Sequence, residues 1–227
     1  LALTSWKIAP ALACGNTIVV KPSEYTSPPL LELAALALEA GFPKGVFNVV
    51  TGFGNEIGAA LIDHKLVAKV AFTGGDQGGQ KVAEAAARHF KKVTLELGGK
   101  SANIVFADAD FDQAIKGAIA GIFGAAGQTC MAGSRLLLER SIHDKFVARM
   151  VELVEAAHIG NPADEQTQVG PIATKAQFQK ILDYIEIAKG EGATCVTGGH
   201  ALTGEQYGQG QFIAPTIFTN TNNAMRI

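Results

Sequence analysis

Apolar and polar residues follow two different patterns along the first hundred residues: short apolar runs and helical spacing. Short apolar runs predict buried strands at residues 17–20, 46–50, 69–73 and 93–97. Helical spacing of apolar positions predicts helices at residues 30–40, 55–62 and 79–90. Strands that alternate with helices in this way indicate parallel βαβ units, in which helices cover both faces of the sheet.

The alternation continues after Gly98-Gly99, where we place a domain boundary, with one domain at residues 1–99 and the other at residues 100–227. Strands are predicted at residues 103–106, 135–139, 194–196 and 212–218. Helices are predicted at residues 110–125, 143–157 and 174–191. We therefore expect the α/β fold class, with ligands bound at the carboxyl ends of the strands.

Composition and charge exclude several kinds of partner. The chain is 48% hydrophobic, which is enough for a core, and its 19 Lys+Arg against 21 Asp+Glu leave a net charge of -2. This balance provides no basic surface for nucleic acid, and no apolar run is long enough to cross a membrane. The chain starts at Leu1 without a visible leader and ends abruptly at Ile227. We therefore interpret it as an internal fragment of a longer protein.

The cysteines and histidines carry little sign of cross-links or metal sites. Cys14, Cys130 and Cys195 are too few and too scattered for a disulfide framework or a zinc site, which favours a reduced, cytoplasmic compartment. None of the five histidines has a second histidine or a carboxylate at metal-ligand spacing, so no metal is predicted.

Cys130 lies within residues 127–135, Gly-Gln-Thr-Cys-Met-Ala-Gly-Ser-Arg, where small side chains would let a substrate carbon reach its sulfur. A catalytic thiol and a small buried apolar residue are both open interpretations of this local pattern. Glu96 lies between two leucines in residues 94–100, Thr-Leu-Glu-Leu-Gly-Gly-Lys, where partial loss of water would suit a general base. A strand-end glutamate paired with Lys100 is the alternative.

Glycine turns follow two of the predicted strands and precede helices. They contain Gly54, Gly58, Thr73, Gly74, Gly75 and Gly79. Such turns bring backbone N–H groups toward a phosphate, although loop glycines without a ligand are more common. Lys21 and Glu24 follow the first strand, where both could hold ribose hydroxyls and Glu24 would repel a 2′-phosphate. An exposed, solvated pair is the alternative for these two residues.

Taken together, these clusters resemble the aldehyde dehydrogenase superfamily over essentially the whole chain. Residues 95–101 resemble its glutamate signature, residues 127–135 resemble its cysteine signature, and Glu96 and Cys130 are 34 residues apart, which is typical of the family. The resemblance implies a Rossmann-like parallel-sheet coenzyme domain and an α/β catalytic domain, both incomplete in this chain. It also implies that the full-length protein is a cytoplasmic homodimer or homotetramer.

The resemblance implies NAD(P)-dependent oxidation of a small aldehyde to a carboxylic acid through a thiohemiacetal and a thioester. Cys130 matches the nucleophile and Glu96 the general base. Positions that match coenzyme-binding positions are Lys21, Glu24, Gly54, Gly58, Thr73, Gly74, Gly75, Gly79 and Leu97. Glu24 favours NAD over NADP. Two positions depart from the family pattern, since Gly75 stands where serine is common and Gly78 where a larger apolar residue often packs on adenine.

Other functions remain open at the level of sequence. An acylating relative would pass the acyl group to coenzyme A, but such enzymes tend to lack a base at the position of Glu96. A non-catalytic nucleotide-binding or structural protein on the same fold is disfavoured because both Cys130 and Glu96 are present. The family's oxyanion asparagine would lie before Leu1, and a segment that holds the nicotinamide ribose would lie after Ile227.

Overall fold

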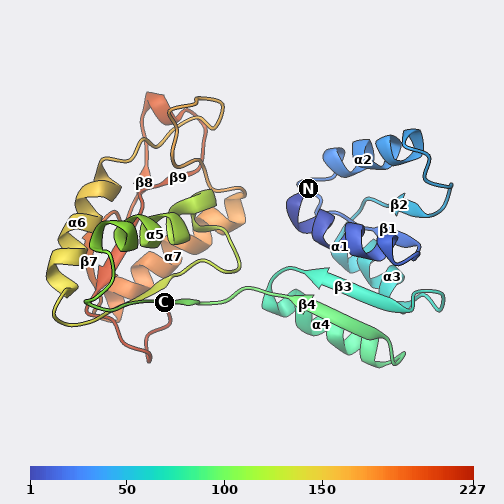
Figure 1. Ribbon diagram of the computed structural model, residues 1–227, viewed down its shortest axis with the longest axis horizontal. Helices are drawn as coiled ribbons and strands as arrows, with labels where there is room; N and C mark the ends of the chain where they lie inside the picture. Colours follow the sequence, from blue (N-terminus) through green and yellow to red (C-terminus); the bar gives the residue numbers. More distant parts are fainter. The chain divides into compact units, whose positions relative to one another are not determined.

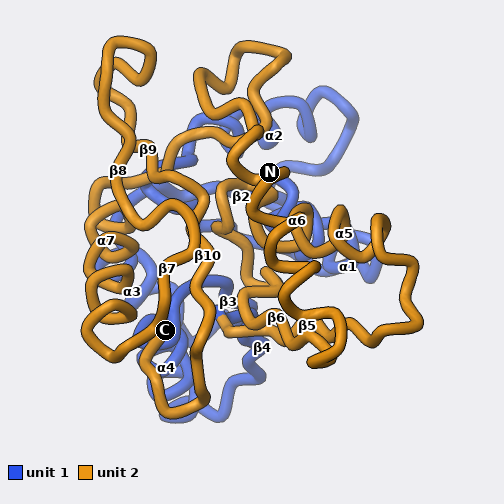
Figure 2. The backbone as a smooth tube through the Cα atoms, turned by 90° about the vertical axis from the view of Figure 1, so that its left-hand side faces the viewer, with its two compact units in different colours: residues 1–98 blue, residues 99–227 orange.

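The computed structural model describes all 227 residues, and they form two compact units, Leu1–Gly98 and Gly99–Ile227 (Figure 2). Each unit combines helices with short strands, and three of the five strand pairs are parallel, so the predicted α/β class is confirmed. The chain divides between Gly98 and Gly99, one residue before the predicted boundary. Their assignment to coenzyme binding and catalysis stays a prediction.

Unit 1 contains two parallel strand pairs with helices between their strands (Figure 1). Its elements are α1 (Ala2–Ala13), β1 (Ile18–Val20), α2 (Pro28–Glu39), β2 (Phe47–Val49), a π-helical turn (Gly54–Gly58), α3 (Ala59–Asp63), β3 (Lys69–Thr73), α4 (Asp76–Ala87) and β4 (Lys92–Glu96). β1 pairs with β2, and β3 pairs with β4, so each pair presents two carboxyl ends at the same edge.

The interior of unit 1 is small. Ile8, Leu30 and Phe47 join α1, α2 and β2 in one buried cluster. Val82 and Ala86 of α4 are also buried, and α4 packs against β3 and β4. The apolar side of α4 therefore fixes the helix against the strand pair that carries Glu96.

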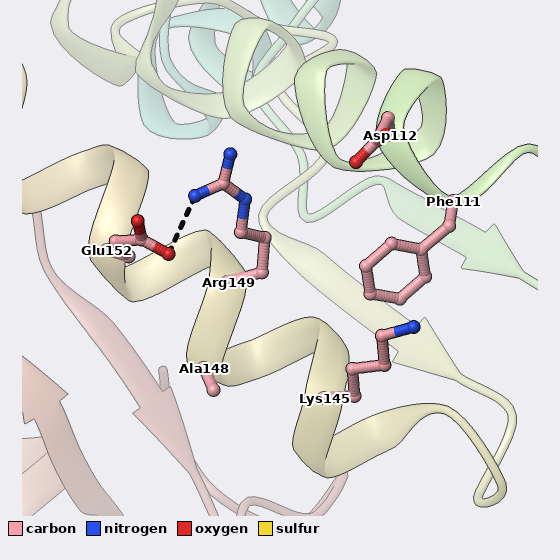
Figure 3. A pocket seen from close by; sticks show the side chains of 6 residues that line it. All are labelled: Phe111, Asp112, Lys145, Ala148, Arg149 and Glu152. Carbon is pink, nitrogen blue, oxygen red and sulfur yellow. Dashed lines mark ion pairs between the residues drawn. The ribbon is translucent and has the colours of Figure 1, made fainter.

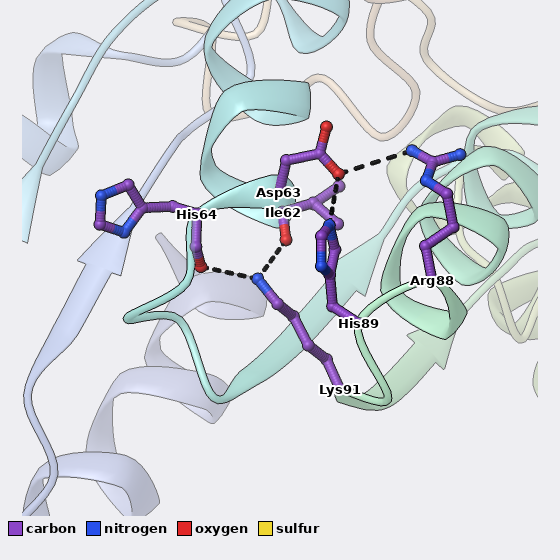
Figure 4. Close-up of polar contacts among 6 residues, drawn as sticks. All are labelled: Ile62, Asp63, His64, Arg88, His89 and Lys91. Atoms are coloured by element: carbon purple, nitrogen blue, oxygen red, sulfur yellow. Dashed lines mark hydrogen bonds and ion pairs between the residues drawn. The ribbon is translucent and has the colours of Figure 1, made fainter.

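Polar contacts join the end of α3 to the turn between α4 and β4 (Figure 4). Asp63 Oδ1 lies 3.1 Å from His89 Nε2 and 3.5 Å from an Arg88 nitrogen. The hydrogen bond from His89, followed by the charge of Arg88, holds the pKa of Asp63 below its usual range. Lys91 donates to the carbonyl oxygens of Ile62 and His64, which closes the end of α3.

Unit 2 contains one parallel pair and two antiparallel pairs. Its elements are β5 (Ala102–Val105), α5 (Phe111–Phe123), a 3₁₀ turn (Gly124–Gly127), β6 (Arg135–Leu138), α6 (His143–Glu155), α7 (Lys175–Gly190), β7 (Thr194–Thr197), β8 (Ala201–Leu202), a second 3₁₀ turn (Glu205–Tyr207), β9 (Phe212–Ile213) and β10 (Ile217–Thr219). β5 and β6 run parallel, whereas β7 pairs antiparallel with β10 and β8 with β9.

Phe146 is the centre of the larger core, which lies in unit 2. It is fully buried together with Ile115 of α5 and contacts the Phe111 ring edge-on at a centroid distance of 5.6 Å. Val105 of β5 belongs to the same cluster, so strand and helices share one interior. This core supports the loop between α5 and β6, in which Cys130 lies.

Three predicted elements differ from the structure. Residues 212–218 form two strands in different sheets, because Pro215 lies in the break between them and cannot donate a ladder hydrogen bond. Residues 55–62 begin as a π-helical turn rather than an α-helix, and the helix predicted at residues 79–90 starts earlier, at Asp76. The helix α1 was not predicted, because Pro10 interrupts its pattern.

The start of α5 gives a stability prediction. Asp110 precedes the helix, and its Oδ1 accepts a hydrogen bond from the Gln113 backbone N–H at 3.0 Å. We expect Asp110→Ala to lower the free energy of unfolding by about 0.5–2 kcal/mol, the usual range for a lost N-cap. Urea unfolding would measure this change. Asp108→Ala is the matched control, and an equal loss in both variants would contradict the capping role.

Many large apolar side chains of unit 1 are exposed. Trp6 is 64% exposed, Leu66 81% and Phe90 97%. In unit 2, Ile104 and Leu137 are also exposed, and they are register partners in the β5–β6 pair. Among the helices, none is both long and apolar enough to cross a membrane.

Candidate active site

The carboxyl ends of β3 and β4 bring several predicted site residues together. Thr73 and Glu96 are register partners at the ends of these strands, and the Gly74 N–H donates to the Glu96 carbonyl oxygen at 3.1 Å. Leu97 follows Glu96 directly. The turn before α4 and the glutamate are therefore held at one edge of unit 1.

Close packing explains two of the glycines in this turn. A Cβ atom at Gly79 would lie 2.6 Å from Leu97 Cδ2, and one at Gly74 would lie 2.5 Å from Phe72 Cζ. A side chain at either position would therefore require Leu97 or Phe72 to move. A Cβ atom at Gly75 would meet nothing within 4 Å, so the backbone at the start of α4 is open on that side.

Lys21 lies at the carboxyl end of the other strand pair. Its Nζ donates to the Gly52 carbonyl oxygen at 3.1 Å and to the Pro22 carbonyl oxygen at 2.5 Å. A Cβ atom at Gly58 would lie 3.8 Å from Lys21 Cδ, so the π-helical turn packs on the lysine stem. Gly54 opens this turn, and Glu24 is exposed in the loop after β1. Unit 1 thus gathers its predicted residues at the ends of two strand pairs.

Glu96 differs from its expected setting. It is exposed in unit 1, whereas its neighbours Leu95 and Leu97 are only partly buried. The two leucines point to the other side of the strand because side chains alternate between faces. The expectation that they remove water from the carboxylate is therefore wrong within unit 1.

Cys130 is exposed in the loop between α5 and β6 of unit 2. The loop is anchored just after Cys130 in sequence, where Gly133 N–H donates to the Gly121 carbonyl oxygen at 3.0 Å and Ala132 is buried. A Cβ atom at Gly133 would lie 3.1 Å from Asn103 Cβ, so the loop lies close against β5. The buried alternative for Cys130 is not observed.

The other cysteines have different surroundings. Cys14 is exposed at the end of α1. Cys195 is partly buried in β7, and its Sγ donates to the Thr197 carbonyl oxygen at 3.3 Å. Exposure alone therefore does not separate Cys130 from Cys14.

A left-handed turn precedes Cys130, and sequence reasoning missed it. Ala125 has φ 51° and ψ 34°, Ala126 has φ 53° and ψ 36°, and Gly127 has φ 71°. For alanine this conformation costs roughly 1–2 kcal/mol per residue, since Cβ crowds the following carbonyl oxygen. The only sequence signal was Gly127, and two alanines favour a continued right-handed helix. Surrounding contacts must therefore hold the turn.

A surface hollow between α5 and α6 contains none of the predicted site residues (Figure 3). Lys145 Nζ lies 4.4 Å from the centre of the Phe111 ring, and Arg149 pairs with Glu152 at 2.7 Å. Glu152 raises the pKa of Arg149 above its usual value. These groups satisfy one another, so we assign no ligand to the hollow.

Comparison with known proteins identifies the group to which the chain belongs. The model of the aldehyde dehydrogenase family matches residues 1–227. The chain belongs to the aldehyde dehydrogenase family. A betaine aldehyde dehydrogenase of Brucella anthropi is 47% identical over all of this chain and 46% of the relative. Aldehyde dehydrogenase 1A1 of Gallus gallus is 50% identical over all of this chain and 44% of the relative.

Solved aldehyde dehydrogenases share the fold. The NAD⁺ complex of an aldehyde dehydrogenase from Bacillus cereus has a TM-score of 0.95 at 44% identity, covering 100% of this chain and 45% of that one. A betaine aldehyde dehydrogenase of Staphylococcus aureus in complex with NAD⁺ has a TM-score of 0.96 at 43% identity, covering 98% of this chain and 44% of that one. The chain thus spans less than half the length of the aldehyde dehydrogenases that it matches.

Proposed function

We propose that this chain is part of a longer enzyme that oxidises a small aldehyde to a carboxylic acid with NAD. The observation that carries the proposal is the exposed Cys130 in a loop of small residues, anchored by the Gly133 backbone and the buried Ala132. A thiol placed in this way is open to an aldehyde carbon. The solved relatives that bind NAD⁺ support the choice of coenzyme.

The residues of unit 1 fit a dinucleotide. Lys21 uses two carbonyl oxygens as acceptors, and an ammonium group has three N–H donors, so one donor is left for a ribose hydroxyl. The open backbone at Gly75 begins a helix of 12 residues, whose first N–H groups suit a phosphate. Gly54 and Gly58 leave the two ends of the neighbouring turn without side chains. When bound, NAD accepts a hydride from the substrate carbon.

The roles of Cys130 and Glu96 follow from the chemistry of an aldehyde. The carbonyl carbon has no leaving group, so the Cys130 sulfur first adds to it and a carbon–sulfur bond forms. In this addition the carbonyl π bond breaks and the oxygen takes up the thiol proton. Loss of hydride from that carbon to NAD, together with release of the oxygen's proton to solvent, leaves a thioester on Cys130. Glu96 then takes a proton from water, the hydroxide adds to the thioester, and the carbon–sulfur bond breaks to release the carboxylate and free Cys130. The exposed position of Glu96 at the end of β4 lets water reach it.

The test is NADH formation by the full-length enzyme with a panel of aldehydes, measured by absorbance with and without coenzyme A. Turnover without coenzyme A supports the proposed hydrolytic reaction. Strict dependence on coenzyme A would instead establish an acylating enzyme. NAD binding without turnover of any aldehyde would favour a non-catalytic nucleotide-binding protein.

Glu24 is expected to set the choice between NAD and NADP. Its carboxylate is exposed close in sequence to Lys21 and would repel the 2′-phosphate of NADP. We expect Glu24→Gln to lower the NAD/NADP ratio of kcat/KM by roughly tenfold, the effect of about 1.4 kcal/mol of lost repulsion. Glu32→Gln on the exposed side of α2 is the control. An unchanged ratio in Glu24→Gln would show a solvated side chain without a role in coenzyme choice.

A further inference from the structure

The side-chain amide of Gln128 lies between two segments that are far apart in sequence. Its Nε2 donates to the Ala125 carbonyl oxygen at 3.2 Å, and its Oε1 accepts from the Ala173 N–H at 3.0 Å. Both ends of the amide are thus used, one on the left-handed turn and the other on the segment before α7. Gln128 is two residues before Cys130.

Each anchor point is itself fixed. The Ala125 carbonyl oxygen also accepts from the Gln128 backbone N–H at 3.1 Å, so backbone and side chain hold the same atom. On the other side, Ile172 is buried, and its N–H donates to the Gln211 carbonyl oxygen at 2.8 Å. Thr174 caps α7 by accepting from the Gln177 N–H at 3.2 Å. Ala173 therefore belongs to a segment that is held on both sides.

Without the Gln128 hydrogen bonds, the left-handed turn at Ala125-Ala126 would change to a conformation of lower energy. Ala125 and Ala126 lie in a conformation that alanine rarely adopts, and a change to right-handed angles would move residues 127–130 with them. The far end of the loop stays in place through Gly133 and Gly121. A released turn would therefore displace Cys130 rather than the whole loop.

We infer that Gln128 is a positioning residue for Cys130, which acts by holding the strained turn at Ala125-Ala126 and tying it to the start of α7. The inference rests on the proposed function, because the position of Cys130 matters only if its sulfur attacks a substrate. The residue touches no reacting atom. Its effect is on the geometry of attack and of hydride loss, which is sensitive to displacements of about 1 Å.

The test compares three variants of the full-length enzyme with the wild type by the rate of the first NADH turnover, the KM for NAD and the melting temperature. Gln128→Ala should slow the first turnover by roughly tenfold to a hundredfold and leave the KM for NAD within about twofold of the wild type. Gln128→Glu keeps the acceptor for Ala173 but loses the donor to Ala125, so an intermediate loss is expected. Gln179→Ala is the control, since that amide pairs only with Asp183 on the surface of α7.

A rescue separates positioning from general stability. Glycine adopts left-handed angles without strain, so Ala125→Gly and Ala126→Gly added to Gln128→Ala should restore most of the first-turnover rate. The same two glycines in the wild type should raise the melting temperature without raising that rate. If Gln128→Ala fails to fold, Gln128→Glu with the two glycines gives the same comparison.

Two results would overturn the inference. One is a first-turnover rate for Gln128→Ala within about twofold of the wild type, and the other is the absence of rescue by the two glycines. Both presuppose an active wild type. A wild-type enzyme that oxidises no aldehyde would overturn the proposed function. An active wild type whose rate is unaffected by Gln128→Ala would overturn only the role of Gln128.

Discussion

Replacement of Cys130 by alanine is expected to abolish aldehyde oxidation in the full-length enzyme. Without the sulfur no bond forms to the carbonyl carbon, and hydride cannot leave from a planar aldehyde. Loss of a nucleophile that acts together with a base lowers kcat by on the order of 10⁴–10⁶-fold. NAD binding should persist because Lys21 and the turn before α4 belong to unit 1 and are unchanged. Steady-state NADH formation and calorimetric titration with NAD would measure the two quantities.

Cys14→Ala is the matched control for this experiment. Cys14 is exposed, as Cys130 is, but it lies at the end of α1 rather than in an anchored loop. Its replacement should leave turnover within about twofold of the wild type, as for surface changes away from a site. Wild-type turnover by Cys130→Ala would show that another group makes the bond to the substrate.

Glu96→Gln is expected to separate the two halves of the reaction. Hydride loss needs no base, so a first burst of NADH should persist, whereas hydrolysis of the thioester should slow. The usual contribution of a positioned base predicts a fall in steady turnover of about 10²–10⁴-fold. Intact-mass measurement during turnover should then find an acyl group on the protein.

Glu84→Gln provides the comparison for Glu96. Glu84 lies on the exposed side of α4 and accepts from Gln80 at 2.9 Å, so its loss should change neither phase. A different outcome for Glu96→Gln would be equally informative. If burst and turnover disappear together, Glu96 acts before hydride transfer, for example by removing the proton of Cys130.

The sequence predicted the alternation of strands and helices well where apolar runs were short and isolated. The strand at Lys69–Thr73 has the predicted bounds, and the others of the first unit differ by at most one residue at each end. The same pattern predicted ligands at the carboxyl ends of the strands, and the structure brings Thr73 and Glu96 together at that edge because the two strands run parallel. Local periodicity and parallel pairing are thus sufficient for this part of the site.

Other features depend on contacts that local sequence does not encode. Gln128 and Ala173 are 45 residues apart, and no pattern in either segment indicates their hydrogen bond. The left-handed alanines contradict their own propensity, because tertiary contacts hold the turn. The exposure of Glu96 was missed because two flanking leucines suggest burial, although alternate residues of a strand face opposite sides.

Gly79 bears on how this chain can vary between individuals and between species. A single methyl group at that position would meet Leu97 Cδ2 at 2.6 Å and Cδ1 at 3.0 Å, and Leu97 directly follows Glu96. A missense change to alanine, mild by any chemical scale, would therefore force the Leu97 side chain out of its present rotamer, next to the residue that carries the base. Gly75, four residues earlier, has no such neighbour. Natural variants should accordingly retain glycine at position 79 while position 75 drifts among small residues.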